Sequence, residues 1–200
     1  MLERIPELPG IELELDDYFA DFGSRLWQVD ATWKLERRQS FREPDVPSWV
    51  AWAEGDRERS LALAEEMRAG IAELQRRLDA QGIVQRRVRI VDLPVTDYLA
   101  WELNVLRIRA ELGERIRVLS SSALAVLEAS GRPVPEVIML GEHIAYQVHY
   151  DAGGVVTGAK LVTAPRVTAA CLPEVAGLWE QGEDLGAFLA RTNVLSSARS

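Results

Sequence analysis

The chain of 200 residues contains few of the residue types on which common catalytic and metal sites depend. Its single cysteine, Cys171, excludes an intramolecular disulfide. Its two histidines, His143 and His149, have neither a cysteine nor a third histidine at the spacing of zinc ligands. There is no Gly-x-Ser-x-Gly motif around a serine, and no glycine-rich loop stands before a predicted helix, where it would bind a phosphate. We therefore expect no metal and no cofactor, and the sequence favours a non-enzymatic protein.

Long apolar stretches are missing as well. No uninterrupted apolar run approaches the roughly 20 residues that span a bilayer. Residues 1–10 contain acids and prolines where a signal peptide would need a basic end and an apolar run. With 48% apolar residues, the chain can instead bury one good core, so we expect a soluble, cytoplasmic protein.

Charge is distributed unevenly along the chain, whose net charge is −8. Residues 1–30 carry eight acids against two arginines, whereas residues 76–117 carry nine arginines against six acids. Net acidity disfavours direct attachment to nucleic acid, which normally needs a basic face. Such binding would require the arginines of the predicted strands to be contiguous and exposed, namely Arg86, Arg87, Arg89, Arg115 and Arg117. A small arginine-lined pocket for an anionic ligand remains open.

The pattern divides the chain into an acidic leader and a body. Residues 1–32 form the leader, in which acids alternate with aromatic residues between Leu15 and Phe22. We expect this leader to be docked on the body and to contain a short helix. Residues 33–200 have no internal repeat and are expected to form a single domain.

Hydrophobic periodicity predicts the elements of this domain. Strands are expected over residues 33–41, 83–91, 115–119, 136–140, 144–150 and 155–162. Helices are expected over residues 48–52, 56–81, 95–112, 165–181 and 183–194, with a further helical segment up to Ala129. The first strand is expected to be half-buried, with Lys34, Glu36 and Arg38 on one side. The order predicts an α/β or α+β fold with a single mixed sheet, in which strand-helix-strand-helix-strand is followed by an antiparallel meander and C-terminal helices.

The helix over residues 95–112 contains polar residues on its apolar side. At 100° per residue, its apolar arc is centred near Tyr98 and includes Glu102 and Arg109, whereas Ala100, Asn104, Arg107 and Glu111 form the expected solvated face. A charge that faces a core needs a partner or a polar cavity, because desolvation of a lone ion costs several kcal/mol.

Two interpretations of this polar set remain open. In the structural one, Glu102 pairs with an arginine of the adjoining strands, Arg87, Arg89 or Arg117, and fixes how the helix sits. In the functional one, Tyr98, Glu102 and Arg109 line a pocket for an anionic or polar ligand. The candidate ligand-binding residues are Tyr98, Glu102, Arg109, Arg87, Arg89 and His149.

A series of short motifs resembles a known family. The motifs are Gln85-Arg-Arg-Val-Arg-Ile-Val91, Pro94 with Asp97-Tyr98 and Trp101-Glu102, Gly113-Glu-Arg-Ile116, Glu136-Val-Ile-Met-Leu140, and Val148-His-Tyr-Asp151 with Gly158-Ala159. Over about residues 33–190, they resemble an actinobacterial domain-of-unknown-function family, whose members are often encoded beside, or fused to, helix-turn-helix regulators. The resemblance implies a regulatory or interaction role and carries over no catalytic residue.

The strand order also resembles half of a phospholipase D-like fold. The chemistry of that fold needs His-x-Lys followed by Asp, and here His149 is followed by Tyr150 and Asp151 without the lysine. The resemblance therefore does not predict a phosphodiesterase.

The leading hypothesis is a regulatory protein that binds a protein partner, such as a helix-turn-helix regulator, through its acidic leader. The alternative is a small-molecule-binding protein or enzyme with a polar pocket around Glu102 and Arg109.

Overall fold

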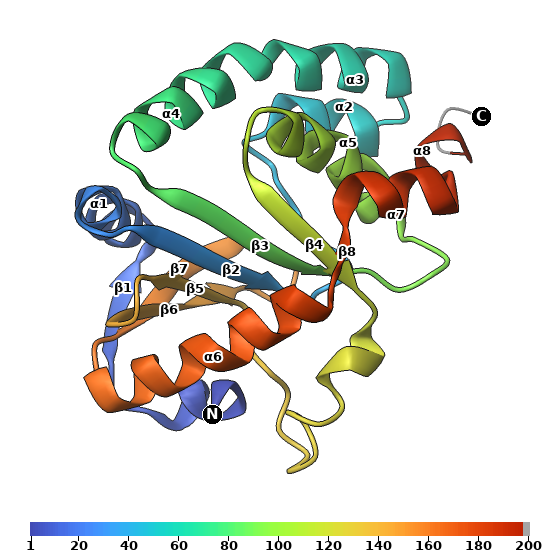
Figure 1. Cartoon of the computed structure of the whole chain (residues 1–200). Coiled ribbons are helices and arrows are strands. Elements are labelled where there is room, and N and C mark those ends of the chain that lie inside the picture. The colour runs from blue at the N-terminus through green and yellow to red at the C-terminus, as the bar shows by residue number, and fades with distance from the viewer. Residues whose placement is uncertain (198–200) are drawn as a thin grey trace.

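The computed structural model describes residues 1–197, which form one eight-stranded mixed sheet with helices on both faces (Figure 1). The strand order is β1-β7-β6-β5-β2-β3-β4-β8. The strands are β1 (Ile11–Glu14), β2 (Ala31–Glu36), β3 (Val84–Ile90), β4 (Arg115–Leu119), β5 (Val137–Leu140), β6 (Ile144–Tyr150), β7 (Val156–Val162) and β8 (Glu183–Asp184). This arrangement confirms the single mixed sheet with packed helices that the sequence predicts.

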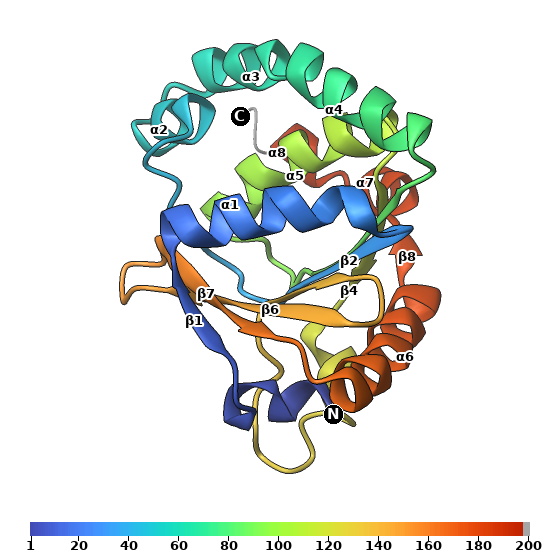
Figure 2. The ribbon, with the colours of Figure 1, turned by 90° about the vertical axis from the view of Figure 1, so that its left-hand side faces the viewer.

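Strands β2, β3 and β4 are parallel, and the helices between them cross one face of the sheet. The first crossover contains α2 (Pro47–Ala53), α3 (Arg57–Glu66) and α4 (Arg68–Ala80), and the second is α5 (Asp97–Glu111). Parallel neighbours require such crossovers. Helix α5 lies next to the sheet, and α3 and α4 arch over it (Figures 1 and 2). Residues that face α5 from the strands are therefore enclosed.

The opposite face of the sheet is covered by α6 (Pro165–Gln181) and by the short 3-10 helix η1 (Leu2–Glu7). Cys171 of α6 is fully buried here, as expected for a core residue. The apolar cluster on this face joins α6 and η1 to the strands and includes Leu2, Ile5, Leu35, Val88, Val137, Cys171 and Val175.

The first residues of the chain lie against both faces of the sheet. Strand β1 pairs antiparallel with β7, and η1 buries Leu2 and Ile5. The predicted short helix is present as α1 (Leu15–Arg25), which lies on the same face of the sheet as α5 (Figure 2). Tyr18 of α1 packs against Tyr146 of β6, with ring centroids 5.4 Å apart.

The predicted bounds of two elements, the first strand and the long helix of the first crossover, are wrong. The helix expected over residues 56–81 is two helices that meet at Met67, which lets α3 and α4 follow the curve over α5. The strand expected to reach Phe41 ends at Glu36. There the backbone N–H groups of Arg37 and Arg38 donate to the carboxylate of Glu136, so the chain leaves the sheet.

Two further predictions are wrong near the C-terminal half. The helix expected from Glu183 begins at Leu185, because Glu183 and Asp184 pair with β4 as β8. The Asp184 side chain then accepts hydrogen bonds from the N–H groups of Gly186 and Ala187 and caps α7 (Leu185–Thr192), which α8 (Val194–Ser197) follows. The segment up to Ala129 contains only a short 3-10 helix, η3 (Ser121–Leu124). None of the helices in residues 1–197 has the length and hydrophobicity needed to cross a bilayer.

Candidate functional site

A network of buried charges lies between the parallel strands and α5. In the register of the sheet, Lys34 lies opposite Arg87 and Glu36 opposite Arg89. Because side chains alternate between the two faces of a strand, these four share the face that α5 covers. Arg87 Nη1 lies 2.6 Å from Glu36 Oε2, and Arg87 Nε lies 2.7 Å from Oε1 of Glu114, in the turn after α5. The strand expected to be half-buried thus buries a charged residue, Glu36.

The predicted pairing of Glu102 with an arginine of the strands is present. Arg89 is completely buried, and its Nε donates to Glu102 Oε2 at 2.7 Å. The Tyr98 hydroxyl lies 3.4 Å from Glu102 Oε1 and 3.2 Å from Glu43 Oε1. Arg117, also considered as a partner, lies elsewhere and donates to the carbonyl of Gly182.

The helical wheel is correct for Tyr98 and Glu102 and wrong for two residues of the expected solvated face. Ala100 and Asn104 are buried, because α3 and α4 arch over this side of α5. Asn104 compensates for its burial by donating from Nδ2 to the carbonyl of Ala100. A helical wheel shows which side of a helix is more polar. It does not show whether other helices cover that side.

Arg109 differs from the other arginines of the network in that its ion pair is long. Its Nη1 lies 3.7 Å from Glu114 Oε2, beyond hydrogen-bond distance, and its side chain is 29% exposed. Burial lowers the pKa of Arg109, and the neighbouring Arg87 acts in the same direction, while Glu114 opposes both. Arg109 therefore retains unused donors.

A cavity of about 290 Å³ lies over this network. Its polar wall contains Lys34, Glu36, Arg87, Glu102 and Arg109, and Glu43 lies beside Tyr98. The rest of the wall is largely apolar and combines aliphatic residues with the aromatic residues Tyr18, Phe19, Phe41, Tyr98, Trp101 and Tyr150. We call this space the interior cavity.

The carboxyl groups around the interior cavity have different proton affinities. Burial alone would raise the pKa of Glu36 and of Glu114, but the surrounding cations, Arg87 foremost, hold both well below the usual range. Burial raises the pKa of Glu43, and it raises that of Glu102 against the opposing effect of Arg89. Two carboxylates are thus firmly ionised, and two others retain their protons to higher pH.

The structure separates His149 from the other candidate residues. Its side chain belongs to β6, where Nδ1 lies 3.4 Å from Glu12 Oε2, and it lines a shallow hollow beside Glu136. Burial raises the pKa of Glu136 to about 7, although the N–H groups of Arg37 and Arg38 oppose the shift. Tyr98, Glu102, Arg87 and Arg109 line the interior cavity, and Arg89 lies beneath it.

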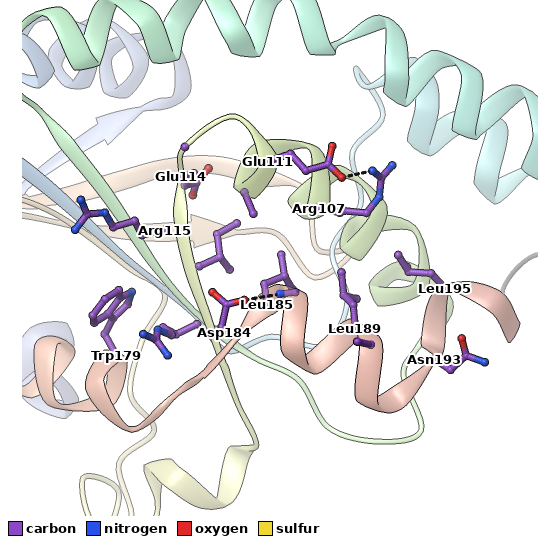
Figure 3. Close-up of a pocket in the computed structure, with 16 residues that line it drawn as sticks. Arg107, Glu111, Glu114, Arg115, Trp179, Asp184, Leu185, Leu189, Asn193 and Leu195 are labelled. Atoms are coloured by element: carbon purple, nitrogen blue, oxygen red, sulfur yellow. Dashed lines mark hydrogen bonds and ion pairs between the residues drawn. The ribbon is translucent and has the colours of Figure 1, made fainter.

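A second hollow, of about 800 Å³, is larger than the interior cavity and shares no lining residue with it. It lies beside the turn between α5 and β4 (Figure 3). We call it the β4 groove. It is bounded by the end of α5, strand β4, the end of α6 and helix α7, with Arg115 and Trp179 toward one end and Leu189 and Leu195 toward the other (Figure 3). Sequence reasoning did not find it, because its residues come from segments that meet only in the folded sheet.

The five arginines that nucleic-acid binding would require do not form one exposed face. Arg87 and Arg89 are buried in the ion pairs under α5. Arg86 and Arg117 lie on the opposite face of the sheet, against Trp179. The strand alternation splits the set between the two faces.

Comparison with known proteins identifies one family and no annotated relative. The sequence pattern of the family described as Domain of unknown function (DUF6879) matches residues 16–190. No curated protein matches the chain. The matched range contains every residue of the interior cavity.

Proposed function

The chain belongs to the DUF6879 family of domains of unknown function, and we propose that it is a cytoplasmic, non-enzymatic protein that binds a small organic anion in the interior cavity. One observation carries the proposal: Arg109 faces this cavity, partly removed from water, and its nearest carboxylate oxygen, Glu114 Oε2, lies 3.7 Å away, beyond hydrogen-bond distance. A partly buried guanidinium is stabilised most by an anion at hydrogen-bond distance. An anionic ligand would supply that close partner.

The other walls of the interior cavity suit a flat ligand. The aromatic side chains offer apolar faces to a ring, and a guanidinium can bind a carboxylate through two parallel hydrogen bonds. A volume of about 290 Å³ lies at the lower end of small-molecule pockets. The ligand class that fits is an aromatic carboxylate of metabolite size.

Native mass spectrometry of the purified chain, with 4-hydroxybenzoate as the probe, tests this proposal. We expect one molecule to bind the wild-type chain and the variant Arg107→Gln, and not Arg109→Gln. Arg107 is the matched control, since it lies on the same helix, is similarly exposed, and pairs with Glu65 and Glu111 outside the interior cavity. Equal binding to Arg109→Gln, or binding to none of the three proteins, would contradict the proposal.

A second candidate function, binding of a regulatory protein partner, is favoured by the surface of residues 11–19. Ile11 is 60% exposed and Phe19 is 55% exposed. The same segment exposes the acidic residues Glu12, Glu14, Asp16 and Asp17. Apolar anchors among acids suit a basic partner surface, such as the DNA-binding face of a helix-turn-helix regulator.

The partner proposal is tested with a helix-turn-helix regulator from the same genome. The double variant Ile11→Ser and Phe19→Ser should lose capture of that regulator in a pull-down, whereas Val126→Ser should keep it. Val126 is the control because it is also strongly exposed, in a different part of the molecule. Undiminished capture by the double variant would contradict the proposal.

A further inference from the structure

We propose that the β4 groove binds an extended, acidic peptide segment of a partner protein, which adds as a strand to the free edge of β4. This site is distinct from the interior cavity and does not rest on a ligand being bound there. Three features of the groove carry the inference: a free strand edge, arginines that form no direct ion pair within residues 1–197, and an apolar wall.

The edge of β4 is only half covered. Strand β8 pairs with β4 at Arg117 and Val118, and within residues 1–197 no strand lies beyond β8. The preceding residues, Arg115 and Ile116, pair with β3 on one side and have no strand neighbour on the other. A strand edge of this kind is a template for an added peptide strand, whose backbone hydrogen bonds supply affinity.

Arginines gather on one side of this edge. Arg115 lies opposite Arg86 in the register of β3 and β4, and Arg117 follows on the same face. The guanidinium of Arg86 lies 4.6 Å from the ring centre of Trp33, and that of Arg117 lies 4.8 Å from that of Trp179. The ion pairs found among residues 1–197 include none of these three arginines.

Arg86 lies close to a like charge. Burial lowers the pKa of Arg86, the neighbouring Arg115 lowers it further, and Glu180 opposes both. Arg115 is exposed and free to turn toward an incoming carboxylate. At this end of the β4 groove Arg86, Arg115 and Arg117 outnumber the carboxylates of Glu180 and Asp184, so the excess positive charge attracts an acidic segment.

The other side of the edge is apolar. Ile116 and Leu185 are buried, and Leu189 and Leu195 pack beside them as partly buried residues. Because side chains of a strand alternate, a peptide paired with β4 would direct every second side chain toward the arginines and the others toward Ile116 and Leu185. A segment in which acidic and apolar residues alternate fits both sides at once.

Fluorescence polarisation with a labelled eight-residue peptide of alternating glutamate and valine tests the proposal on the full chain. We expect saturable binding that Arg115→Glu weakens at least about tenfold, since the change reverses charge at an exposed position. Arg166→Glu is the matched control and should leave the affinity unchanged. Arg166 is likewise exposed, but it lies in the first turn of α6, whereas Trp179 lies near the end of that helix.

Two companion peptides separate strand addition from general charge attraction. A lysine–valine peptide should not bind, because its charge is wrong. The glutamate–valine peptide with N-methylated backbone should also fail, because it keeps the charge and loses the hydrogen bonds. Equal binding of the methylated peptide would overturn strand addition.

Other occupants of the groove are distinguished by the same variants. Failure of the glutamate–valine peptide to bind would overturn the proposal, as would an equal effect of Arg115→Glu and Arg166→Glu. Binding of single-stranded oligothymidine in place of the peptide would assign the arginines to nucleic acid. Self-association of the chain in sedimentation experiments that Arg115→Glu abolishes would assign the groove to a second copy, and either result would overturn the peptide assignment.

Discussion

Arg87 lies between Glu36 and Glu114, and all three side chains are buried. Glu114 depends on this guanidinium for close neutralisation, and Glu36 shares it with Lys34, whose Nζ lies 2.6 Å from Glu36 Oε1. The energetic role of Arg87 is therefore larger than that of a surface arginine. Removal of one member of a buried ion pair leaves an uncompensated charge, whereas removal of an exposed one leaves a hydrated charge.

We expect Arg87→Met to lower the free energy of unfolding by about 3–5 kcal/mol, because it leaves Glu36 and Glu114 buried without their arginine. Urea unfolding at pH 7 measures the loss. Arg76→Met is the control, since Arg76 pairs with Glu73 on the surface of α4 and should hardly change the midpoint. Equal midpoints for the two variants would show that the network contributes little.

The stability of the fold should depend on the protonation of Glu136. Its pKa is about 7 in the fold, against an ordinary value of 4.5. Between these values the folded chain holds a proton that the unfolded chain has released, so this contribution is complete below pH 4.5 and is lost as the pH rises through 7. The loss is on the order of 3 kcal/mol.

Glu136→Gln should abolish that part of the pH dependence, because glutamine stays neutral and its oxygen can still accept from the N–H of Arg38. Urea unfolding at pH 5 and pH 8 compares the slopes of wild type and variant. The exposed Glu58→Gln should leave the slope unchanged. An unaltered slope in Glu136→Gln would show that Glu136 is ionised in the fold at neutral pH.

At the scale of elements, the pairing of β1 with β7 depends on Gly158. This residue has φ +151°, and a Cβ atom there would overlap the carbonyl oxygen of Leu13 in β1. A side chain at this position therefore pushes β1 away from β7. We expect Gly158→Ala to cost on the order of 2 kcal/mol and to speed amide exchange in residues 11–14.

Gly70→Ala provides the contrast for this element. Gly70 lies inside α4, and nothing lies within 4 Å of an added Cβ. Alanine should therefore stabilise the chain by about 0.5–1 kcal/mol. Equal melting temperatures for the two alanine variants would contradict the close approach at Gly158.

The elements themselves were largely predictable, and the networks between them were only partly so. The period of α5 was sufficient to place Glu102 inward, and the arginine-rich strand before it supplied Arg89 as a partner. The alternation of side chains in β2 could not reveal that Glu36 is buried. Alternation separates the two faces of a strand, but it does not show whether helices cover one face or both. Glu43 and Glu114 lie in loops, where no period applies.

At the scale of the whole molecule, the first nine residues contribute two side chains to the core. Leu2 and Ile5 are fully buried, and the carbonyls of Ile5 and Pro6 accept hydrogen bonds from Lys160 Nζ. Deletion of residues 1–9 should lower the free energy of unfolding by more than about 4 kcal/mol. The exposed Arg4→Ala should change it little, and a deletion variant as stable as Arg4→Ala would contradict this role.

The sequence suggested a docked leader without indicating where it docks. An acidic, aromatic composition does not say which strand will accept β1, since pairing partners distant in sequence leave no local pattern. The same reason hid the β4 groove, which exists because β8 pairs with only part of β4.

The pairing of β1 with β7 also fixes an order of events during synthesis. The contact between Ile5 and Lys160 joins residues 155 positions apart in the chain. The amino-terminal segment therefore leaves the ribosome long before β7 has been synthesised. Until then it stays unpaired and exposed to solvent. Loop closure over such a distance is slow. The many carboxylates of residues 1–30 repel one another and keep this segment hydrated. We expect this hydration to protect the nascent chain from aggregation until β7 emerges.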